Sequence, residues 1–415
     1  MNLLTGIKNF IIMKNRSKFP RVSYGMSVHG KEEIQAVNKV LKTSTQMGKN
    51  VRSFENKVAN LFDKKYGLMT NSGSSALLIA MEILNFKKDS EIITPVLTFG
   101  TTVSSLLKAG YKPIFVDVNK NTYCINTEEI ENKITKNTKA ILAPDLLGNI
   151  CDWEKIKKIA KKYKLYALHD SADTIGSKLN NKSVGFYTDI SITSFYGSHI
   201  INGAGNGGML CLNNKDMYRK ALLLRSWGRS SSLIKNSENE NQRFNKKIKN
   251  FYYDRKFLFE IPGYQLEPSE ISGAFGLAQL KKLNIFKSIR KKIYKSHYNF
   301  FSKHNHLFIN PEENINADTA WLAYPILVKK NKYFNRTDMQ KFLESRNIQT
   351  RAIFTGNILS QPGFAFLKET NNQKYHNADF VMRNGLLIGL HHGLKDKHLK
   401  HVYNSVELFI KKVIR

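Results

Sequence analysis

Two short polar stretches hold the residues best suited to chemistry. In the first, Asp170 ends an apolar run and Asp173 follows it closely. In the second, Ser194 ends a β-rich run and His199 follows in a glycine-rich loop. A buried carboxylate can hold a proton on a ring nitrogen, and a histidine, with an ordinary pKa of about 6.5, can act as a base at neutral pH. The pattern is typical of a cofactor site at strand ends.

A third polar stretch lies at a predicted strand-to-helix turn and reads Asn71-Ser72-Gly73-Ser74-Ser75-Ala76. Backbone amides at such a turn, next to a helix N-terminus, can bind a phosphate. Small residues in this position are more often simple helix caps, so the motif by itself leaves both interpretations open. Phe99 follows another apolar run, and the sequence by itself favours core packing for this residue.

Together these motifs resemble those of the fold-type I, pyridoxal-phosphate-dependent sugar aminotransferases and dehydratases, which act on nucleotide-linked 4-keto sugars. The resemblance covers nearly the whole chain. It implies that Asp170 binds the pyridine nitrogen, that Phe99 stacks on the ring, and that Asp173 supports Asp170 or the ring hydroxyl. The resemblance also implies four residues that contact the cofactor phosphate: Gly73, Ser74, Ser75 and Ser194.

His199 stands where most of these enzymes have a lysine that tethers the cofactor. Within the family this replacement resembles the sugar 3-dehydratases. An imidazole forms no stable imine, so we expect pyridoxal or pyridoxamine 5′-phosphate to be held noncovalently and His199 to be the catalytic general base. The resemblance implies removal of the C3 hydroxyl from a nucleotide-activated 4-keto-6-deoxyhexose, with glutamate as amino donor, in surface-polysaccharide or lipopolysaccharide synthesis. Arg229 and Arg351 are candidates for contacts with the anionic substrate.

Two other functions are consistent with the sequence. One is a sugar aminotransferase of the same family that works without its lysine. The other is a noncatalytic protein of this fold that binds sugar nucleotides or, given a net charge of +32, nucleic acid. The lysines are scattered over polar faces, which favours an ordinary solvated surface, so we expect no nucleic-acid partner. No apolar run reaches the roughly 18 residues of a membrane span, so we expect no membrane partner.

The three cysteines lie far apart, outside any CxxC pair, at Cys124, Cys151 and Cys211. This spacing predicts neither a disulfide framework nor a metal site, and it indicates a cytoplasmic protein. One dehydratase of the resembled family carries an iron-sulfur cluster on cysteines after a Trp-Gly-Arg motif. Here Trp227-Gly228-Arg229 is followed by serines, so no cluster is expected.

The elements that must position these residues alternate between strands and helices. Apolar runs at 91–95, 113–118, 140–144, 165–170, 190–194 and 208–212, separated by helical patterns such as 153–163, predict an α/β protein with a mainly parallel sheet. The resemblance makes this a seven-stranded sheet between helices, with a small α+β C-terminal domain. We predict an N-terminal arm (1–25), a large domain (26–285) and a small domain (286–415).

A polar stretch at about 230–256 has no apolar periodicity and predicts a loop or partly ordered insertion. The segments on either side of it resemble the dimer-interface elements of the family. They imply a homodimer in which each subunit helps to complete the site of the other.

Overall fold

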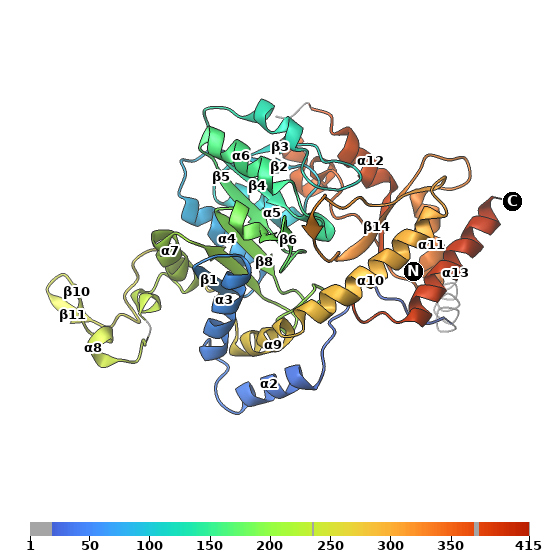
Figure 1. Cartoon of the computed structure of the whole chain (residues 1–415). Helices are drawn as coiled ribbons and strands as arrows, with labels where there is room; N and C mark the ends of the chain where they lie inside the picture. Colours follow the sequence, from blue (N-terminus) through green and yellow to red (C-terminus); the bar gives the residue numbers. More distant parts are fainter. Residues whose placement is uncertain (1–18, 235, 369–372, 415) are drawn as a thin grey trace, which may run out of the picture.

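The computed structural model describes residues 19–234, 236–368 and 373–414. At its centre is a seven-stranded sheet in the order β1-β9-β8-β5-β4-β2-β3 (Figure 1). Its members are β1 (Tyr66–Thr70), β2 (Glu91–Pro95), β3 (Lys112–Val116), β4 (Thr138–Pro144), β5 (Tyr166–Asp170), β8 (Ile190–Ser194) and β9 (Gly208–Leu212). Only β9 runs antiparallel to its neighbours. The predicted mainly parallel sheet is therefore confirmed.

Helices cover both faces of this sheet because alternate strand residues are apolar on each face. Leu68 and Leu142 pack on one face in a core with α4 (Gly73–Leu84) and α7 (Lys215–Arg225). On the other face Met69 packs with α3 (Lys49–Leu61), and Ile141 with α6 (Trp153–Tyr163). The sheet is thus anchored rigidly on both sides, and its strand ends can hold side chains in fixed positions.

A second sheet, four-stranded and antiparallel, follows the long helix α10 (Leu283–Ser302). Its order is β12 (Phe308–Ile309), β14 (Ala323–Val328), β16 (Gly385–Gly389), β15 (Thr350–Ala352), and α11 (Arg336–Ser345) and α13 (Asp396–Val413) pack beside it. Helix α10 contributes to both cores: Leu283 lies in the core of the large sheet and Phe301 in that of the small one. Figure 1 shows α10 running from one body to the other.

Arg290 of α10 binds the segments that flank two strands of the small sheet. The residue is 0% exposed, and one guanidinium nitrogen donates to the carbonyls of Trp321, Leu322 and Leu390 at 3.0, 3.0 and 2.8 Å. Its Nε donates to His392 at 3.3 Å. The two carbonyls before β14 and the one after β16 are therefore tied to the same side chain.

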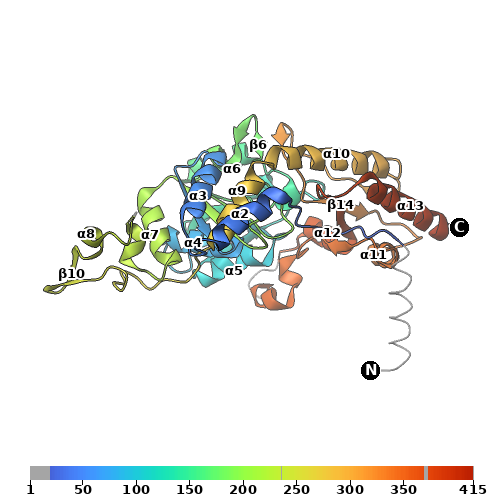
Figure 2. The same cartoon turned by 90° about the horizontal axis from the view of Figure 1, so that it is seen from below.

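The polar insertion contains more regular structure than the sequence indicated. It holds a short helix, α8 (Glu240–Arg243), and a hairpin of β10 (Lys246–Ile248) and β11 (Phe251–Tyr253). Figure 2 shows this hairpin projecting from the body of the molecule. The aromatic run at the end of the stretch favours a strand, which outweighs the polar composition before it.

None of the helices within the described ranges is long and apolar enough to cross a membrane.

Candidate active site

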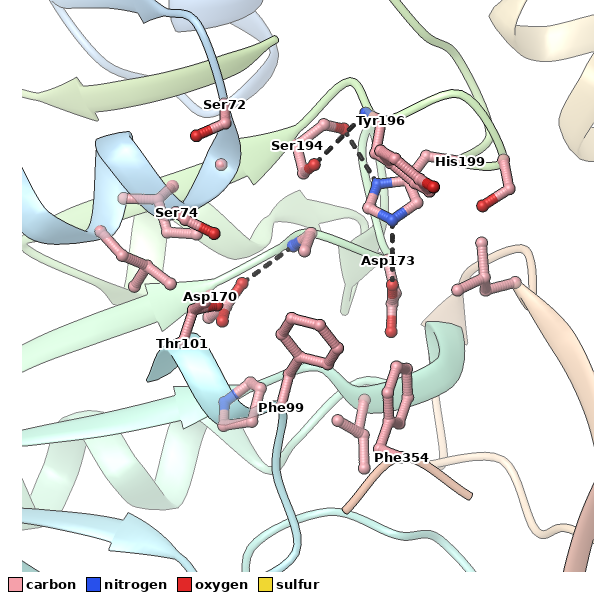
Figure 3. A pocket seen from close by; sticks show the side chains of 18 of the residues that line it. Ser72, Ser74, Phe99, Thr101, Asp170, Asp173, Ser194, Tyr196, His199 and Phe354 are labelled. Atoms are coloured by element: carbon pink, nitrogen blue, oxygen red, sulfur yellow. Dashed lines mark hydrogen bonds and ion pairs between the residues drawn. The ribbon is translucent and has the colours of Figure 1, made fainter. Parts of the chain in front are cut away.

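A cavity of about 350 Å³ opens where β5 and β8 end and where α4 begins (Figure 3). This is the edge at which parallel sheets bind their ligands. The predicted residues that line it are Gly73, Ser74, Phe99, Asp170, Asp173, Ser194 and His199. The structure thus brings together seven side chains or backbones that the sequence places far apart.

The start of α4 lies at the turn where the sequence predicts an anion cup. Ser72 is the N-cap, and its hydroxyl accepts a hydrogen bond from the amide of Ser75 at 3.1 Å. A side chain on Gly73 would lie 2.7 Å from Cβ of Ser194, so only glycine lets the turn approach β8 this closely. Ser74 faces the cavity, as Figure 3 shows, and the helix N-terminus favours an anion there.

Ser75 is placed differently from the other predicted phosphate contacts. Its hydroxyl donates to the side chain of Asn71 at 2.6 Å and lies 2.9 Å from that of Ser72. It does not belong to the cavity lining. In this arrangement its side chain stabilises the turn, while the cavity is left to Gly73 and Ser74.

Asp170 ends β5 and is 5% exposed. Its carboxylate accepts hydrogen bonds from the amide of Ala172 at 3.1 Å and from the hydroxyl of Thr102 at 3.2 Å. In the described part of the chain it forms no salt bridge with a lysine or arginine. Burial raises its pKa, so a protonated ring nitrogen in the cavity would be a favourable partner for the anionic form.

His199 lies in the loop after β8, and its ring faces the cavity (Figure 3). Nδ1 lies 3.2 Å from the backbone oxygen of Ser194. A carbonyl oxygen can only accept, so Nδ1 carries the proton and Nε2 keeps its lone pair. Burial lowers the pKa of His199 to about 4. The imidazole is therefore neutral at pH 7, with a free basic nitrogen.

Asp173 faces that nitrogen, with Oδ1 at 4.0 Å from His199 Nε2. Its other oxygen accepts the backbone amide of Leu147 at 2.9 Å. Burial raises the pKa of Asp173 to about 7, and the negative charge of Asp170 adds to the rise. Asp173 therefore changes its charge in the physiological range, next to the base.

Phe99 is not a core residue. It is 53% exposed, and its ring lies edge-on to that of Phe354, with the centroids 6.0 Å apart. Figure 3 shows both rings at the same side of the cavity. An exposed aromatic ring at a strand end offers an apolar face to a planar ligand.

The two arginines proposed for substrate contacts lie outside the cavity lining. The guanidinium of Arg229 stacks over the ring of Trp227 at 4.2 Å, at the start of the insertion. That of Arg351, on β15, lies 5.5 Å from the ring of Tyr24. Within one chain neither arginine reaches the cavity, so their role in substrate binding stays a prediction.

Several lining residues were not predicted from the sequence: Tyr24, Ser72, Thr101, Tyr196, Ser198, Asn206, Leu322 and Phe354. Most of them adjoin motifs that we had singled out, and a neighbour of a site motif is a reasonable candidate. Tyr24 carried no such signal, because it falls in the segment predicted as an arm. The described cavity lining includes no lysine.

The cysteines Cys124, Cys151 and Cys211 are buried and free. Within the described ranges, no three His, Cys, Asp or Glu side chains are grouped as a metal site would require.

Comparison with known proteins decides the family. The model of the DegT/DnrJ/EryC1/StrS aminotransferase family matches residues 28–407. The chain belongs to this family.

Among curated members of the family, a GDP-4-keto-6-deoxy-D-mannose 3-dehydratase of Yersinia pseudotuberculosis is 30% identical over 398 residues, 94% of this chain and 98% of the relative. The lipopolysaccharide biosynthesis protein RfbH of Salmonella typhimurium is 32% identical over 368 residues, 86% of this chain and 84% of the relative. The solved structure of an E. coli GDP-4-keto-6-deoxy-D-mannose-3-dehydratase with bound hydrated PLP is 29% identical, with a TM-score of 0.82 over 93% of this chain and 100% of that one. The predicted fold-type I architecture is therefore confirmed.

Proposed function

We propose that this chain is a pyridoxal/pyridoxamine-phosphate-dependent 3-dehydratase, which removes the C3 hydroxyl of a nucleotide-activated 4-keto-6-deoxyhexose for surface-polysaccharide or lipopolysaccharide synthesis. The observation that carries the proposal is His199, which presents a neutral, unprotonated Nε2 to a cavity whose described lining has no lysine. Such a cavity cannot tether a cofactor aldehyde as an imine, but it can abstract a proton.

The cavity fits this cofactor. Gly73 and Ser74 offer a phosphate cup at the N-terminus of α4, with Ser75 shaping the turn and the hydroxyl of Ser194 beside it. Asp170 provides a buried carboxylate for the pyridine nitrogen, and Phe99 an open ring face. When bound, the cofactor supplies an electron sink for a bond broken next to it.

The residues of the chain then handle the proton. Nε2 of His199 accepts it, because Nδ1 is already committed to the carbonyl of Ser194. The imidazolium that forms lies 4.0 Å from Asp173, whose negative charge stabilises it. A base with a low pKa releases the proton readily afterwards, so His199 is reset for the next cycle.

We also propose a homodimer, noncovalent cofactor binding, glutamate as amino donor and a cytoplasmic location. The dimer is supported by exposed aromatic residues on and near the projecting hairpin: Phe251 (53%), Tyr252 (63%), Tyr253 (40%), Phe257 (58%) and Phe259 (57%). An apolar group of this size on a projection favours burial against another protein surface. The two 3-dehydratases described above act, by their names, on a GDP-linked sugar, and another relative is named as a 3-dehydratase of a dTDP-linked sugar, so GDP and dTDP are the first nucleotides to test.

The test is incubation of the purified protein with pyridoxamine phosphate, glutamate and a panel of GDP-, CDP- and dTDP-linked 4-keto-6-deoxy sugars. A 3-deoxy-4-keto product with release of ammonia supports the proposal, and a stable 4-amino sugar would instead support the aminotransferase. Borohydride treatment should leave the cofactor removable by dialysis. Absence of cofactor uptake, together with salt-sensitive DNA binding, would favour the noncatalytic alternative.

A further inference from the structure

Residues 22–28 form a strap that crosses from the small sheet to the loop that carries His199. At one end Val22 pairs with the segment before β15: its amide donates to the carbonyl of Asn347 at 3.0 Å, and its carbonyl accepts from the amide of Gln349 at 2.9 Å. The side chain of Ser23 lies 3.1 Å from Nε2 of His391, just after β16. This end of the strap is therefore fixed to the small sheet.

The other end is fixed to the large body. The carbonyl of Val28 accepts a hydrogen bond from the side chain of Gln279, on α9 (Glu270–Leu280), at 3.0 Å. Between the two ends, Gly25 passes so close to Ser198 that a Cβ on the glycine would lie 2.7 Å from Cβ of that serine. Ser198 directly precedes His199, so the strap packs against the loop of the proposed base.

Tyr24 lies on the strap between these fixed points and lines the same cavity as His199 and Asp173. Its amide donates to the side chain of Gln349 at 3.1 Å, which holds the backbone in place. Its hydroxyl has no hydrogen-bond partner among the described residues. Burial raises the pKa of Tyr24, and the negative charge of Asp173 raises it further. The phenol therefore keeps its proton at physiological pH and can donate it to a ligand.

We propose that Tyr24 is a catalytic residue that gives the departing C3 oxygen its proton. This inference rests on the proposed dehydratase function. In the step, His199 Nε2 accepts a proton from the amine-bearing carbon of the bound cofactor. The C3–O bond of the substrate breaks, and its electron pair stays on oxygen. The Tyr24 phenol transfers its proton to that oxygen, so that water leaves. Hydroxide is a much stronger base than a phenolate, so this transfer is favourable even from a buried phenol.

The phenolate that remains regains a proton from the imidazolium of His199, which restores both residues. One water molecule is released: its hydroxyl comes from the substrate, and the balancing proton comes from the cofactor carbon, whose electron pair replaces the one that leaves with oxygen. The tautomer of His199 explains why a second residue is needed for the other proton transfer. Because Nδ1 is held by the carbonyl of Ser194, only Nε2 faces the cavity. At the moment when that nitrogen is taking a proton from carbon, a different group must supply one to the oxygen.

The test compares Tyr24→Phe, which removes only the hydroxyl, with Tyr333→Phe, an exposed tyrosine outside the cavity lining, as a matched control. We expect kcat for deoxygenation to fall by about 10²-fold in Tyr24→Phe, with KM within about threefold of the wild type. The control should match the wild type. Cofactor binding, followed by its absorbance, should be unchanged in both variants.

A second measurement separates the two proton transfers. In D₂O, exchange of the hydrogen on the amine-bearing carbon of the cofactor, with substrate present, reports on His199 alone. It should persist in Tyr24→Phe and disappear in His199→Ala. Loss of exchange in Tyr24→Phe, or an unchanged kcat, would overturn the assignment of Tyr24. If the wild type makes an amino sugar instead, the proposed function and this inference fall together; wild-type deoxygenation with an unimpaired Tyr24→Phe overturns this inference alone.

Gly25→Ala tests the strap by a different route. The added methyl group must displace either Tyr24 or the loop at Ser198. We expect a loss of kcat at least as large as that of Tyr24→Phe, because both proton-transferring residues adjoin this contact. Full activity in Gly25→Ala would contradict a strap that holds Tyr24 in place.

Discussion

Two cavities lie at opposite ends of the strands of the large sheet, and each contains a buried ionisable side chain. The surroundings of the two side chains differ. At the carboxyl ends of β5 and β8 the cavity contains His199, with a free basic nitrogen. At the amino ends of the same strands a cavity of about 300 Å³ contains Lys64, which is 5% exposed and whose pKa burial lowers to about 8.

Lys64 has the shifted pKa expected of a reactive amine, but its surroundings are those of a structural residue. Its Nζ donates to the backbone oxygen of Thr188. The described lining of this cavity contains no glycine-rich turn at a helix N-terminus, and the nearby carboxylate of Asp189 accepts the backbone amide of Ala167 at 2.8 Å. A perturbed pKa therefore identifies a functional site only where other groups converge on the same space.

Replacement of His199 by alanine is the strongest test of this contrast. We expect deoxygenation to fall by about 10²- to 10⁴-fold, because the base is removed, while the cofactor remains bound. Product formation and cofactor absorbance should be measured together on the same sample. An active His199→Ala variant would place the base elsewhere in the cavity.

Asp170→Asn removes the carboxylate proposed to face the pyridine nitrogen. Loss of a charge-assisted hydrogen bond should weaken cofactor binding by about 10- to 100-fold, measured by equilibrium dialysis. Asp189→Asn is a matched control at the opposite edge of the sheet and should bind cofactor like the wild type. Equal affinity in the two variants would remove Asp170 from the site.

The charge of Asp173 should be visible in the pH dependence of kcat/KM. Its pKa is raised to about 7, so it becomes anionic, and able to stabilise the imidazolium of His199, as the pH rises from 6 to 8. We expect activity to rise by about tenfold over this interval and Asp173→Asn to abolish the rise. His199, with a pKa of about 4, should add no change above pH 5. A rise that persists in Asp173→Asn would have to come from another group.

Lys64→Met should have the smallest effect on activity, within about twofold of the wild type, because Lys64 is remote from the catalytic cavity. Its effect should appear in stability. The pKa of Lys64 is lower in the folded than in the unfolded state, so the unfolded chain binds more protons between pH 8 and 10.5. The free energy of unfolding of the wild type should therefore rise over this interval by about 2–3 kcal/mol relative to Lys64→Met, as urea denaturation would show. If the free energies of unfolding of the wild type and of Lys64→Met changed equally with pH, Lys64 would be solvated in the folded protein.

Most strands of the large sheet, and the residues that meet at the candidate site, could be predicted from local sequence. Asp170 and Ser194 end apolar strand runs and His199 follows the second of them, and parallel strands bring their carboxyl ends to one side of the sheet. Helix α6 has the bounds that the helical pattern at 153–163 predicted, because its apolar periodicity is a local signal. The hairpin of the insertion was missed, because few apolar residues in it face a core.

Contacts between distant segments could not be predicted in this way. Tyr24 reaches the cavity only because residues 22–28 pair with a segment beyond residue 346, and nothing near Tyr24 in the sequence indicates that pairing. Ser75 shows a different limit. The strand-to-helix turn that contains it was predicted from the sequence, but the direction of its hydroxyl depends on the side chain of Asn71. Local patterns place the backbone of a site better than they orient its side chains.

The guanidinium of Arg290 restricts how the small sheet can move relative to α10. A shift of β14 or β16 along this helix would have to break the bonds of Arg290 to the carbonyls that flank the two strands, and would leave a fully desolvated cation without acceptors. The middle of α10 and the small sheet should therefore move as one rigid body, so that any rotation of the small sheet against the large one must take place outside this stretch of the helix.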